Sequence, residues 1–210
     1  MIKLHHLNQS RSKRIIWLLE ELGLDYEVVA YQRDSVTFLA PPELKSVHPL
    51  GKSPVIEEDG IVITESGAIT EYLIEKYGAD KLAPKRGTQA HTEYLQWLHF
   101  AESSAVLPLL LKVFVAKDGA EMNFLDGYAE VETQKVMSYF DASLEGKTYL
   151  VEERLTGADI MMSFIAEMLY SLGMLEQFSN IKRYVALLAE HPAYQKANAV
   201  EADYDVTVSH

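Results

Sequence analysis

The first third of the chain alternates short apolar runs with segments of helical periodicity. Ile2 to Leu7 has the pattern of a strand, and apolar positions then recur at helical spacing from Ile15 to Leu22, where Gly23 is expected to end a helix. A second short apolar run covers Tyr26 to Ala30. A strand, a helix and a strand within about thirty residues form a βαβ unit, so this segment predicts a parallel pair of strands.

The next segment has the pattern of a hairpin followed by a helix. After a short helix start at Pro41 to Lys45, two apolar runs flank the pair Asp59-Gly60, and Asp-Gly is a strong hairpin signal. We expect Ser66 to cap a helix that Gly78 ends. The order βαβ, then α, then ββα is that of a thioredoxin-like α/β domain.

After Leu82 the chain shows helical periodicity only. A polar stretch containing Pro84 and Gly87 has the composition of a linker. Helices are predicted at about 88–117, 124–144, 157–171 and 178–190. We therefore expect an N-terminal α/β thioredoxin-like domain, a linker and an all-α C-terminal helical bundle, at residues 1–82, 83–87 and 88–210.

Composition excludes several kinds of chemistry. The 210 residues include no cysteine, which removes disulfides, zinc–thiolate sites and any thiol nucleophile of the protein itself. Any sulfur chemistry must therefore use a bound thiol. The net charge of -12 argues against a nucleic-acid partner and against anionic membrane surfaces. The 7 histidines show no metal-ligand spacing, so no metal site is predicted.

The sequence also argues against membrane insertion and export. The first residues lack the pattern of a signal peptide. The longest apolar stretch, Ala105 to Ala116, contains Pro108 and Lys112 and is too short to span a bilayer. We therefore expect a cytoplasmic protein without a membrane partner.

Three segments carry candidate chemistry, and each also has a structural interpretation. In the first, Pro54 stands at the start of a predicted strand, where it cannot donate to the ladder. A cis peptide at Ser53–Pro54 would turn the backbone N–H and C=O of Ser53 toward a peptide-like ligand. The alternative is an ordinary trans turn before an edge strand.

The second segment runs from Thr64 to Ile69. Ser66 at a helix N-terminus offers a hydroxyl and backbone N–H groups to a carboxylate, and Glu65 beside it can bind an ammonium group. The pair therefore fits the α-amino-acid end of a ligand. Taken alone, a plain helix cap is the simpler interpretation of this segment.

The third segment follows the first predicted strand and contains Ser10 and Ser12. A hydroxyl there can hydrogen-bond a bound thiolate. Lowering a thiol pKa by about 2 units takes roughly 2.7 kcal/mol, most of which one charge-assisted hydrogen bond supplies. We expect Ser12 to cap the following helix, which leaves Ser10 as the freer hydroxyl. The alternative is one capping serine beside a solvated basic face.

A fourth motif is structural. Thr156 and Asp159 have the spacing of a capping box, with Leu155 and Ile160 at the positions of a hydrophobic staple. We assign this motif no chemistry.

Together these segments resemble the glutathione transferase family along the whole chain. The resemblance rests on the opening SRSKRIIWLLEELGLDYE, the loop HPLGKSPVI, the helix start ITESGAITEYL and the motif LTGADI. Each is weak alone, but the four occur in the family's order across the change from mixed to helical pattern. The GKSP loop and the helix QWLHFAESSAVLPLLL resemble a fungal and bacterial branch in which GKSP replaces the commoner GKVP.

The resemblance implies that the N-terminal domain binds glutathione as a co-substrate, without a further cofactor. Glu65 and Ser66 would then hold the γ-glutamyl group. The backbone of Ser53, before a cis Pro54, would hold the cysteinyl group, and Lys52 is a candidate for the glycyl carboxylate.

The resemblance also implies a homodimer and a catalytic hydroxyl. Ser10 stands four residues before Arg14, which matches the catalytic serine of the theta-like and phi-like classes. Neither Ser10 nor Ser12 has the usual sequence context of that serine. The helical domain would complete an apolar acceptor pocket, whose candidate walls are His6, Phe100, Ser104 and Leu107.

We therefore expect an enzyme that conjugates the glutathione thiolate to small apolar electrophiles. One alternative is a glutathione-dependent peroxidase or disulfide reductase, which acts on a peroxide or a disulfide. Another is a transferase-like binding module without catalysis. The sequence does not identify the electrophile.

Overall fold

The computed structural model describes residues 1–119 and 123–205. By its internal contacts the chain divides into two compact units. Unit 1 comprises Met1–Gly78 with Ala189–His210, and unit 2 comprises Ala79–Leu188. Unit 1 is a mixed α/β unit, whereas the described part of unit 2 contains helices and no strand.

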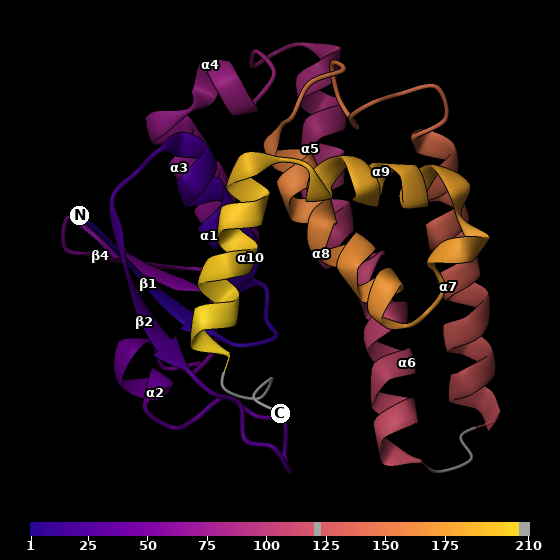
Figure 1. The fold of residues 1–210 in the computed structure, drawn as a ribbon, viewed down its shortest axis with the longest axis horizontal. Helices are drawn as coiled ribbons and strands as arrows, with labels where there is room; N and C mark the ends of the chain where they lie inside the picture. Colours follow the sequence, from indigo (N-terminus) through magenta and orange to yellow (C-terminus); the bar gives the residue numbers. More distant parts are fainter. Residues whose placement is uncertain (120–122, 206–210) are drawn as a thin grey trace. The chain divides into compact units, whose positions relative to one another are not determined.

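Unit 1 contains a four-stranded sheet in the order β2-β1-β3-β4 (Figure 1). Strand β1 (Ile2–Leu7) pairs in parallel with β2 (Tyr26–Tyr31) and antiparallel with β3 (Val55–Glu58). Strand β4 (Ile61–Thr64) then pairs antiparallel with β3. The predicted parallel pair and the predicted hairpin are thus both confirmed, and the sheet has the thioredoxin-like order.

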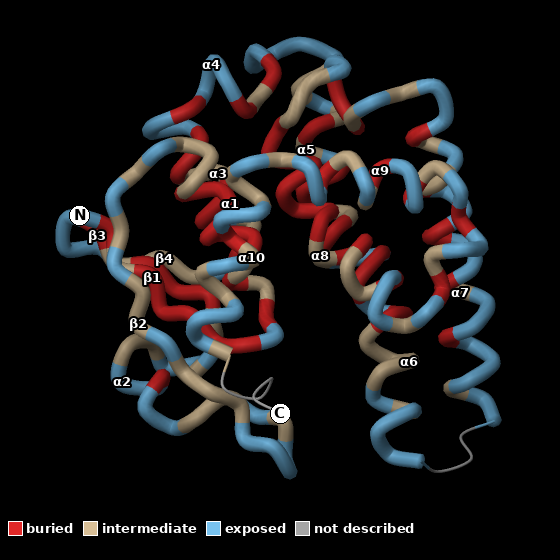
Figure 2. Tube along the Cα trace, viewed as in Figure 1, coloured by how far each residue is buried: buried red, intermediate tan, exposed pale blue. Residues whose placement is uncertain are grey.

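The helices of unit 1 bury their apolar faces around this sheet. They are α1 (Ser12–Leu22), α2 (Leu44–Val47), α3 (Ser66–Tyr77) and α10 (Pro192–Tyr204). Helix α1 contacts β1, α3 and α10, and most of its residues are buried (Figure 2). Gly23 ends α1 as expected, because its left-handed backbone (φ 65°) lets its N–H bond the carbonyls of Leu19 and Glu20.

Helix α10 lies far from the rest of unit 1 in sequence, yet it packs along α1 (Figure 1). The rings of Trp17 and Tyr194 meet edge to face at 5.0 Å, and Lys196 binds Glu20 at 2.6 Å. The expected boundaries assigned every residue from 88 to 210 to the helical domain, and this division places α10 with the sheet instead. The reason is that α1 presents apolar surface away from the sheet as well as toward it.

Unit 2 is built from helices of very different lengths. They are α4 (Ala79–Leu82), α5 (Gln89–Glu102), α6 (Val106–Asp118), α7 (Asn123–Ser143), α8 (Gly157–Ser171), the 3-10 helix η1 (Leu175–Gln177) and α9 (Ser179–Ala189). The single helix expected at 88–117 is two helices, α5 and α6. Pro108 lacks the N–H that a continuous helix would need to bond residue 104, so the helix is interrupted at residues 103–105 and Pro108 lies in the first turn of α6.

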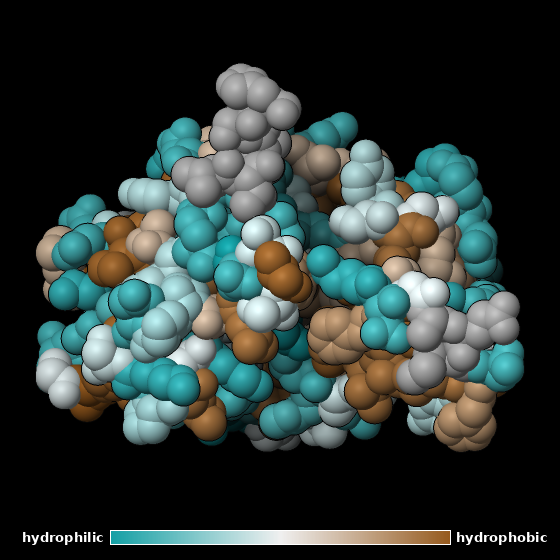
Figure 3. Space-filling model, turned by 90° about the horizontal axis from the view of Figure 1, so that it is seen from below, coloured by the Kyte–Doolittle hydropathy of each residue, from teal (hydrophilic) through white to brown (hydrophobic). Residues whose placement is uncertain are grey.

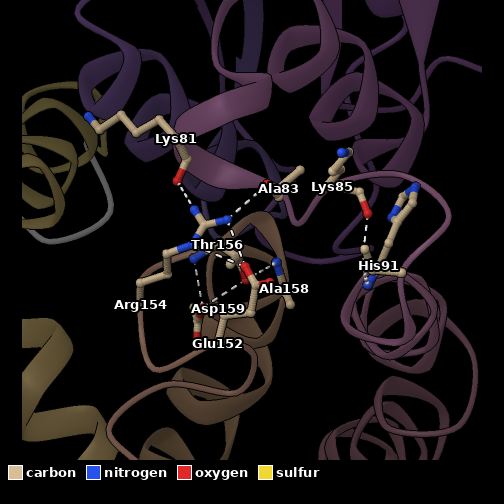
Figure 4. A network of polar contacts seen from close by, with 10 residues as sticks. Lys81, Ala83, Lys85, His91, Glu152, Arg154, Thr156, Ala158 and Asp159 are labelled. Carbon is tan, nitrogen blue, oxygen red and sulfur yellow. Dashed lines mark hydrogen bonds and ion pairs between the residues drawn. The ribbon is translucent and has the colours of Figure 1, made fainter.

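The predicted capping box at the start of α8 is confirmed. Asp159 accepts hydrogen bonds from the backbone N–H of Thr156 at 2.8 Å, and the Thr156 side chain accepts one in return from the first turn (Figure 4). Beside it, Arg154 donates to the carbonyl oxygens of Lys81 and Ala83. This network fixes the loop before α8 to the segment after α4.

By length and mean hydropathy alone, the segment Gln89–Asp118 would suffice to cross a membrane. In the structure this segment is α5 and α6, and α5 buries Tyr94 and Trp97 within unit 2. Core helices of soluble proteins pass the same test. Apolar side chains are also exposed on α6 and α7, and Figure 3 shows brown side chains gathered on the right of its view, the side of these helices.

Candidate functional site

The predicted ligand-binding residues of unit 1 stand where β1 ends and where β3, α1 and α3 begin. The antiparallel pairing of His5 with Val55 brings the end of β1 beside the start of β3. The peptide bond Ser53–Pro54 is cis, as the first of the two interpretations of this loop predicts. The described part of the chain provides no partner for the backbone N–H or C=O of Ser53.

The side chain of Ser53 anchors this loop to β1. Its hydroxyl donates to the carbonyl oxygen of His5 at 2.8 Å and accepts from the N–H of Leu7 at 3.1 Å. These bonds continue the connection between β1 and the loop at a point where Pro54 cannot donate. The identity of residue 53 therefore matters for the position of the cis peptide, a contribution that the resemblance to the family did not indicate.

Ser66 is the first residue of α3, and it does not cap the helix as expected. The N-cap position belongs to Glu65, and no side chain caps this end. The Ser66 hydroxyl instead accepts a hydrogen bond from Nη2 of Arg14 at 3.0 Å. Because the guanidinium can only donate, the hydroxyl proton of Ser66 is directed elsewhere, which suits it to donate to a carboxylate.

Glu65 has the backbone angles φ 64° and ψ 116°, which are rare for a residue with a side chain. Such conformations cost on the order of 1–3 kcal/mol and cluster at ligand-binding sites. The Glu65 side chain is exposed beside the N-terminus of α3. An acidic group here lies next to hydroxyl and N–H donors, so the segment can bind both ends of an α-amino acid.

Arg14 is a residue of the candidate site that sequence reasoning missed. The sequence offered only a solvated basic face, as the structural alternative for this segment, yet Arg14 is 2% exposed and reaches from α1 to α3. The signal was available in the spacing, because Arg14 lies one helical turn before the buried Leu18.

Ser10 and Ser12 form a buried pair, with 2.7 Å between their hydroxyl oxygens. The expectation that Ser12 caps α1 is wrong. The Ser12 hydroxyl donates back to the carbonyl oxygen of Leu7 at 3.1 Å, and the hydroxyl of Ser10 accepts from the N–H of Ser12 at 3.2 Å. Ser10 is therefore the serine whose side chain accepts a hydrogen bond from the N-terminal N–H of α1, and it is 4% exposed.

His6 lies behind this pair and presents no surface to an electrophile, since its exposed fraction is 0%. Its Nδ1 is 2.8 Å from the Ser12 hydroxyl. Burial lowers the pKa of His6 to about 4, although the nearby Asp205 carboxylate acts in the opposite direction. The ring is therefore neutral at physiological pH. The His6 ring therefore contacts the Ser12 hydroxyl rather than a ligand pocket.

The other candidate residues are dispersed. Lys52 is exposed beside the cis-peptide loop. Phe100 lines a groove of about 890 Å³ within unit 2, together with Trp97 and Tyr139, whose rings stack at 5.6 Å. Ser104 and Leu107 are exposed, and neither lines that groove. In unit 2 alone, the three predicted pocket residues therefore do not line one cavity. Within the described residues, no cluster of three metal-ligating side chains occurs.

Comparisons with known proteins find one family in both parts of the chain. The family model described as "Glutathione S-transferase, N-terminal domain" matches residues 1–75, and the one described as "Glutathione S-transferase, C-terminal domain" matches residues 125–192. Glutathione S-transferase 3 of Schizosaccharomyces pombe is 34% identical, over 99% of this chain and 91% of its own length. Glutathione S-transferase 1 of Saccharomyces cerevisiae is 29% identical, over 97% of this chain and 98% of its own length.

Solved structures show the same likeness. A glutathione S-transferase from Actinobacillus pleuropneumoniae superposes with a TM-score of 0.87 at 38% identity, over 100% of this chain and 97% of that one. A glutathione transferase homolog from Lodderomyces elongisporus, solved with two GSH per subunit, gives 0.81 at 25% identity, over 95% and 98%. The chain thus matches the family in sequence and in fold. The chain belongs to the glutathione S-transferase family and is a glutathione transferase.

Proposed function

We propose that this transferase binds reduced glutathione in unit 1 and conjugates it, through its sulfur, to small apolar electrophiles. The observation that carries the proposal is the Arg14–Ser66 bond at the start of α3, together with the cis peptide at Ser53–Pro54. The related structure from Lodderomyces elongisporus, solved with GSH, supports the choice of thiol.

The γ-glutamyl group is assigned to the start of α3. Its carboxylate accepts from the Ser66 hydroxyl, which Arg14 holds as an acceptor on its other side. The N–H groups of the first turn add to this attraction, because they have no partner within the helix. The exposed Glu65 carboxylate takes the α-ammonium group.

The cysteinyl group is assigned to the loop before β3. The backbone N–H and C=O of Ser53 pair with it in the manner of an added strand. Lys52, exposed beside this loop, takes the glycyl carboxylate. These contacts fix the glutathione backbone, so the sulfur is presented toward the end of β1, where Ser10 lies.

The reaction needs a thiolate and a positioned acceptor. The Ser10 hydroxyl donates to the sulfur and favours its ionised form. The sulfur then attacks an electrophilic carbon, so that a C–S bond forms while the leaving group departs with its electron pair. Holding both reactants together supplies much of the rate enhancement.

The experiment is calorimetric titration with reduced glutathione, followed by turnover with 1-chloro-2,4-dinitrobenzene and with cumene hydroperoxide. Binding with conjugation of the aryl chloride supports the proposal. Reduction of the hydroperoxide without conjugation favours the peroxidase alternative, since the chain has no cysteine and bound glutathione is the only thiol available. Absence of glutathione binding by a folded protein refutes the assignment.

The assembly and the location of the enzyme are also proposed. We expect a homodimer, as the family resemblance implies, because symmetric dimers are the commonest assembly of soluble chains. The net charge of -12 argues against a nucleic-acid or membrane partner. We also expect a cytoplasmic enzyme, as the resemblance to the cytosolic type of the family implies.

A further inference from the structure

The Ser12 hydroxyl oxygen lies within hydrogen-bond reach of more possible donors than it has lone pairs. Three groups that can donate lie within reach of it: the Ser10 hydroxyl at 2.7 Å, Nδ1 of the His6 ring at 2.8 Å, and the Leu7 N–H at 3.3 Å, which is shared with the Ser53 hydroxyl at 3.1 Å. A hydroxyl oxygen has two lone pairs, so it cannot accept fully from all three groups at once. The single proton of Ser12 is used by the carbonyl oxygen of Leu7 at 3.1 Å.

The tautomer of His6 follows from the same count. Its Nε2 is buried and has no hydrogen-bond partner among the residues that the structure describes. If Nε2 carried the proton, a buried N–H would lack an acceptor, and Ser12 would have to turn its proton from Leu7 to Nδ1. If Nδ1 carries the proton, the Leu7 carbonyl oxygen keeps the Ser12 hydroxyl as its donor. Only the lone pair of His6 Nε2 then lacks a partner. The second arrangement leaves fewer buried groups without a partner.

Of the three groups, the Ser10 hydroxyl is then the one that can turn away. The two N–H donors, of His6 and Leu7, are held by the ring and by the backbone. The Ser10 hydroxyl rotates freely about its C–O bond, and its oxygen already accepts from the N–H of Ser12. When a sulfur anion approaches, the Ser10 proton can turn toward it without leaving the Ser12 oxygen unsatisfied.

We propose that His6 is a positioning residue for thiol activation: its Nδ1–H bond to Ser12 keeps the proton of Ser10 available to the glutathione sulfur. This rests on the proposed function, in which Ser10 donates to the thiolate. His6 touches neither substrate nor sulfur, and acts through Ser12 and Ser10. Without its donor, a lone pair of Ser12 opens to Ser10, whose proton then turns inward.

The test compares variants that remove or keep the donor. His6→Phe keeps a ring of similar size without a donor. His6→Asn places its amide N–H near the position of Nδ1, and is the matched control. Ser10→Ala tests the proposed function itself. The pKa of bound glutathione is measured from the ultraviolet absorbance of its thiolate, and binding of S-methylglutathione, which has no thiol to ionise, reports whether the site is intact.

We expect His6→Phe to raise the pKa of the bound thiol by about 1 unit, a tenfold smaller acid dissociation constant, with S-methylglutathione binding unchanged. His6→Asn should retain the wild-type thiol pKa. The double variant with Ser10→Ala should match Ser10→Ala alone, because the two residues act on one proton. If His6→Phe does not fold, His6→Gln replaces it, since its amide lies near Nε2 and offers no donor to Ser12.

Three results would overturn the inference. An unchanged thiol pKa in His6→Phe, with a raised value in Ser10→Ala, rejects the role of His6 and leaves the proposed function intact. Additive shifts in the double variant show that His6 acts independently of Ser10. An unchanged thiol pKa in Ser10→Ala rejects the proposed role of Ser10, and the role of His6 falls with it.

Discussion

Replacing Ser66 by alanine removes one hydrogen-bond donor from the proposed glutathione site and one acceptor from Arg14. The hydroxyl lies at the start of α3 and accepts from Arg14 at 3.0 Å. Hydrogen bonds to charged groups contribute about 1.5–3 kcal/mol, so the Kd for glutathione should rise about 12- to 140-fold. The N–H groups of α3 remain, which is why binding should weaken without being abolished.

The same substitution should also destabilise the free protein. Arg14 is 2% exposed, so an Nη2–H that loses its acceptor is not rehydrated by bulk water. We expect the free energy of unfolding to fall by about 1–3 kcal/mol. The two effects are measured separately, by calorimetric titration with glutathione and by urea unfolding.

Ser103→Ala is the matched control, because its exposed hydroxyl bonds only its own helix, at the carbonyl oxygen of His99. It should change neither quantity. Unchanged glutathione affinity in a folded Ser66→Ala protein would refute the carboxylate assignment. Unchanged stability with lost affinity would instead show that Arg14 finds another acceptor.

The remaining predictions concern four other features. Ser10→Ala should raise the pKa of bound glutathione by about 1–2 units and lower turnover near neutral pH about tenfold, whereas Ser12→Ala should leave that pKa nearly unchanged; thiolate absorbance and steady-state rates distinguish them. Asp159→Asn should lower the free energy of unfolding by about 2–4 kcal/mol in urea, because its buried carboxylate accepts four hydrogen bonds, while the exposed Asp126→Asn should have little effect. The pKa of His6 falls from 6.5 to about 4 on folding, so the unfolded chain binds more protons in that window and stability should decline as pH falls through it; in His6→Phe this part of the pH dependence should vanish. Light scattering should give twice the 23.7 kDa chain mass, and a monomer mass at micromolar concentration would contradict the proposed dimer.

The element order from β1 to α3 was predictable because its strands and turns depend on local chemistry. The Asp59-Gly60 turn joins β3 to β4, and Gly23 ends α1. All three residues have a positive φ, a left-handed backbone that Gly and Asp adopt more readily than most residues. The cis peptide before Pro54 could be proposed for a similar local reason, because a proline at a strand start has no N–H to donate to the neighbouring strand.

The details that sequence reasoning missed depend on long-range packing. The predicted helices end at about residue 190, so both α10 (Pro192–Tyr204) and its packing on α1 were missed. Ser12 and Ser66 were wrongly expected to cap helices because a serine near a helix start usually does so, whereas here each hydroxyl bonds a buried side chain, of His6 and of Arg14. The electrophile pocket was not predictable residue by residue, because the fold does not dictate the side chains that line it.

The packing of α10 on α1 has a consequence for biosynthesis. Lys196 and Glu20 meet although 176 positions separate them in the chain. The ribosome releases the N-terminus first, so β1, α1 and β2 emerge long before the helix that covers Trp17 and His6 exists. During that interval the unit must remain open on one side or be shielded by a chaperone. Forming a contact across so many residues is also slow. Unit 1 is therefore the first to begin folding during translation and the last to complete it.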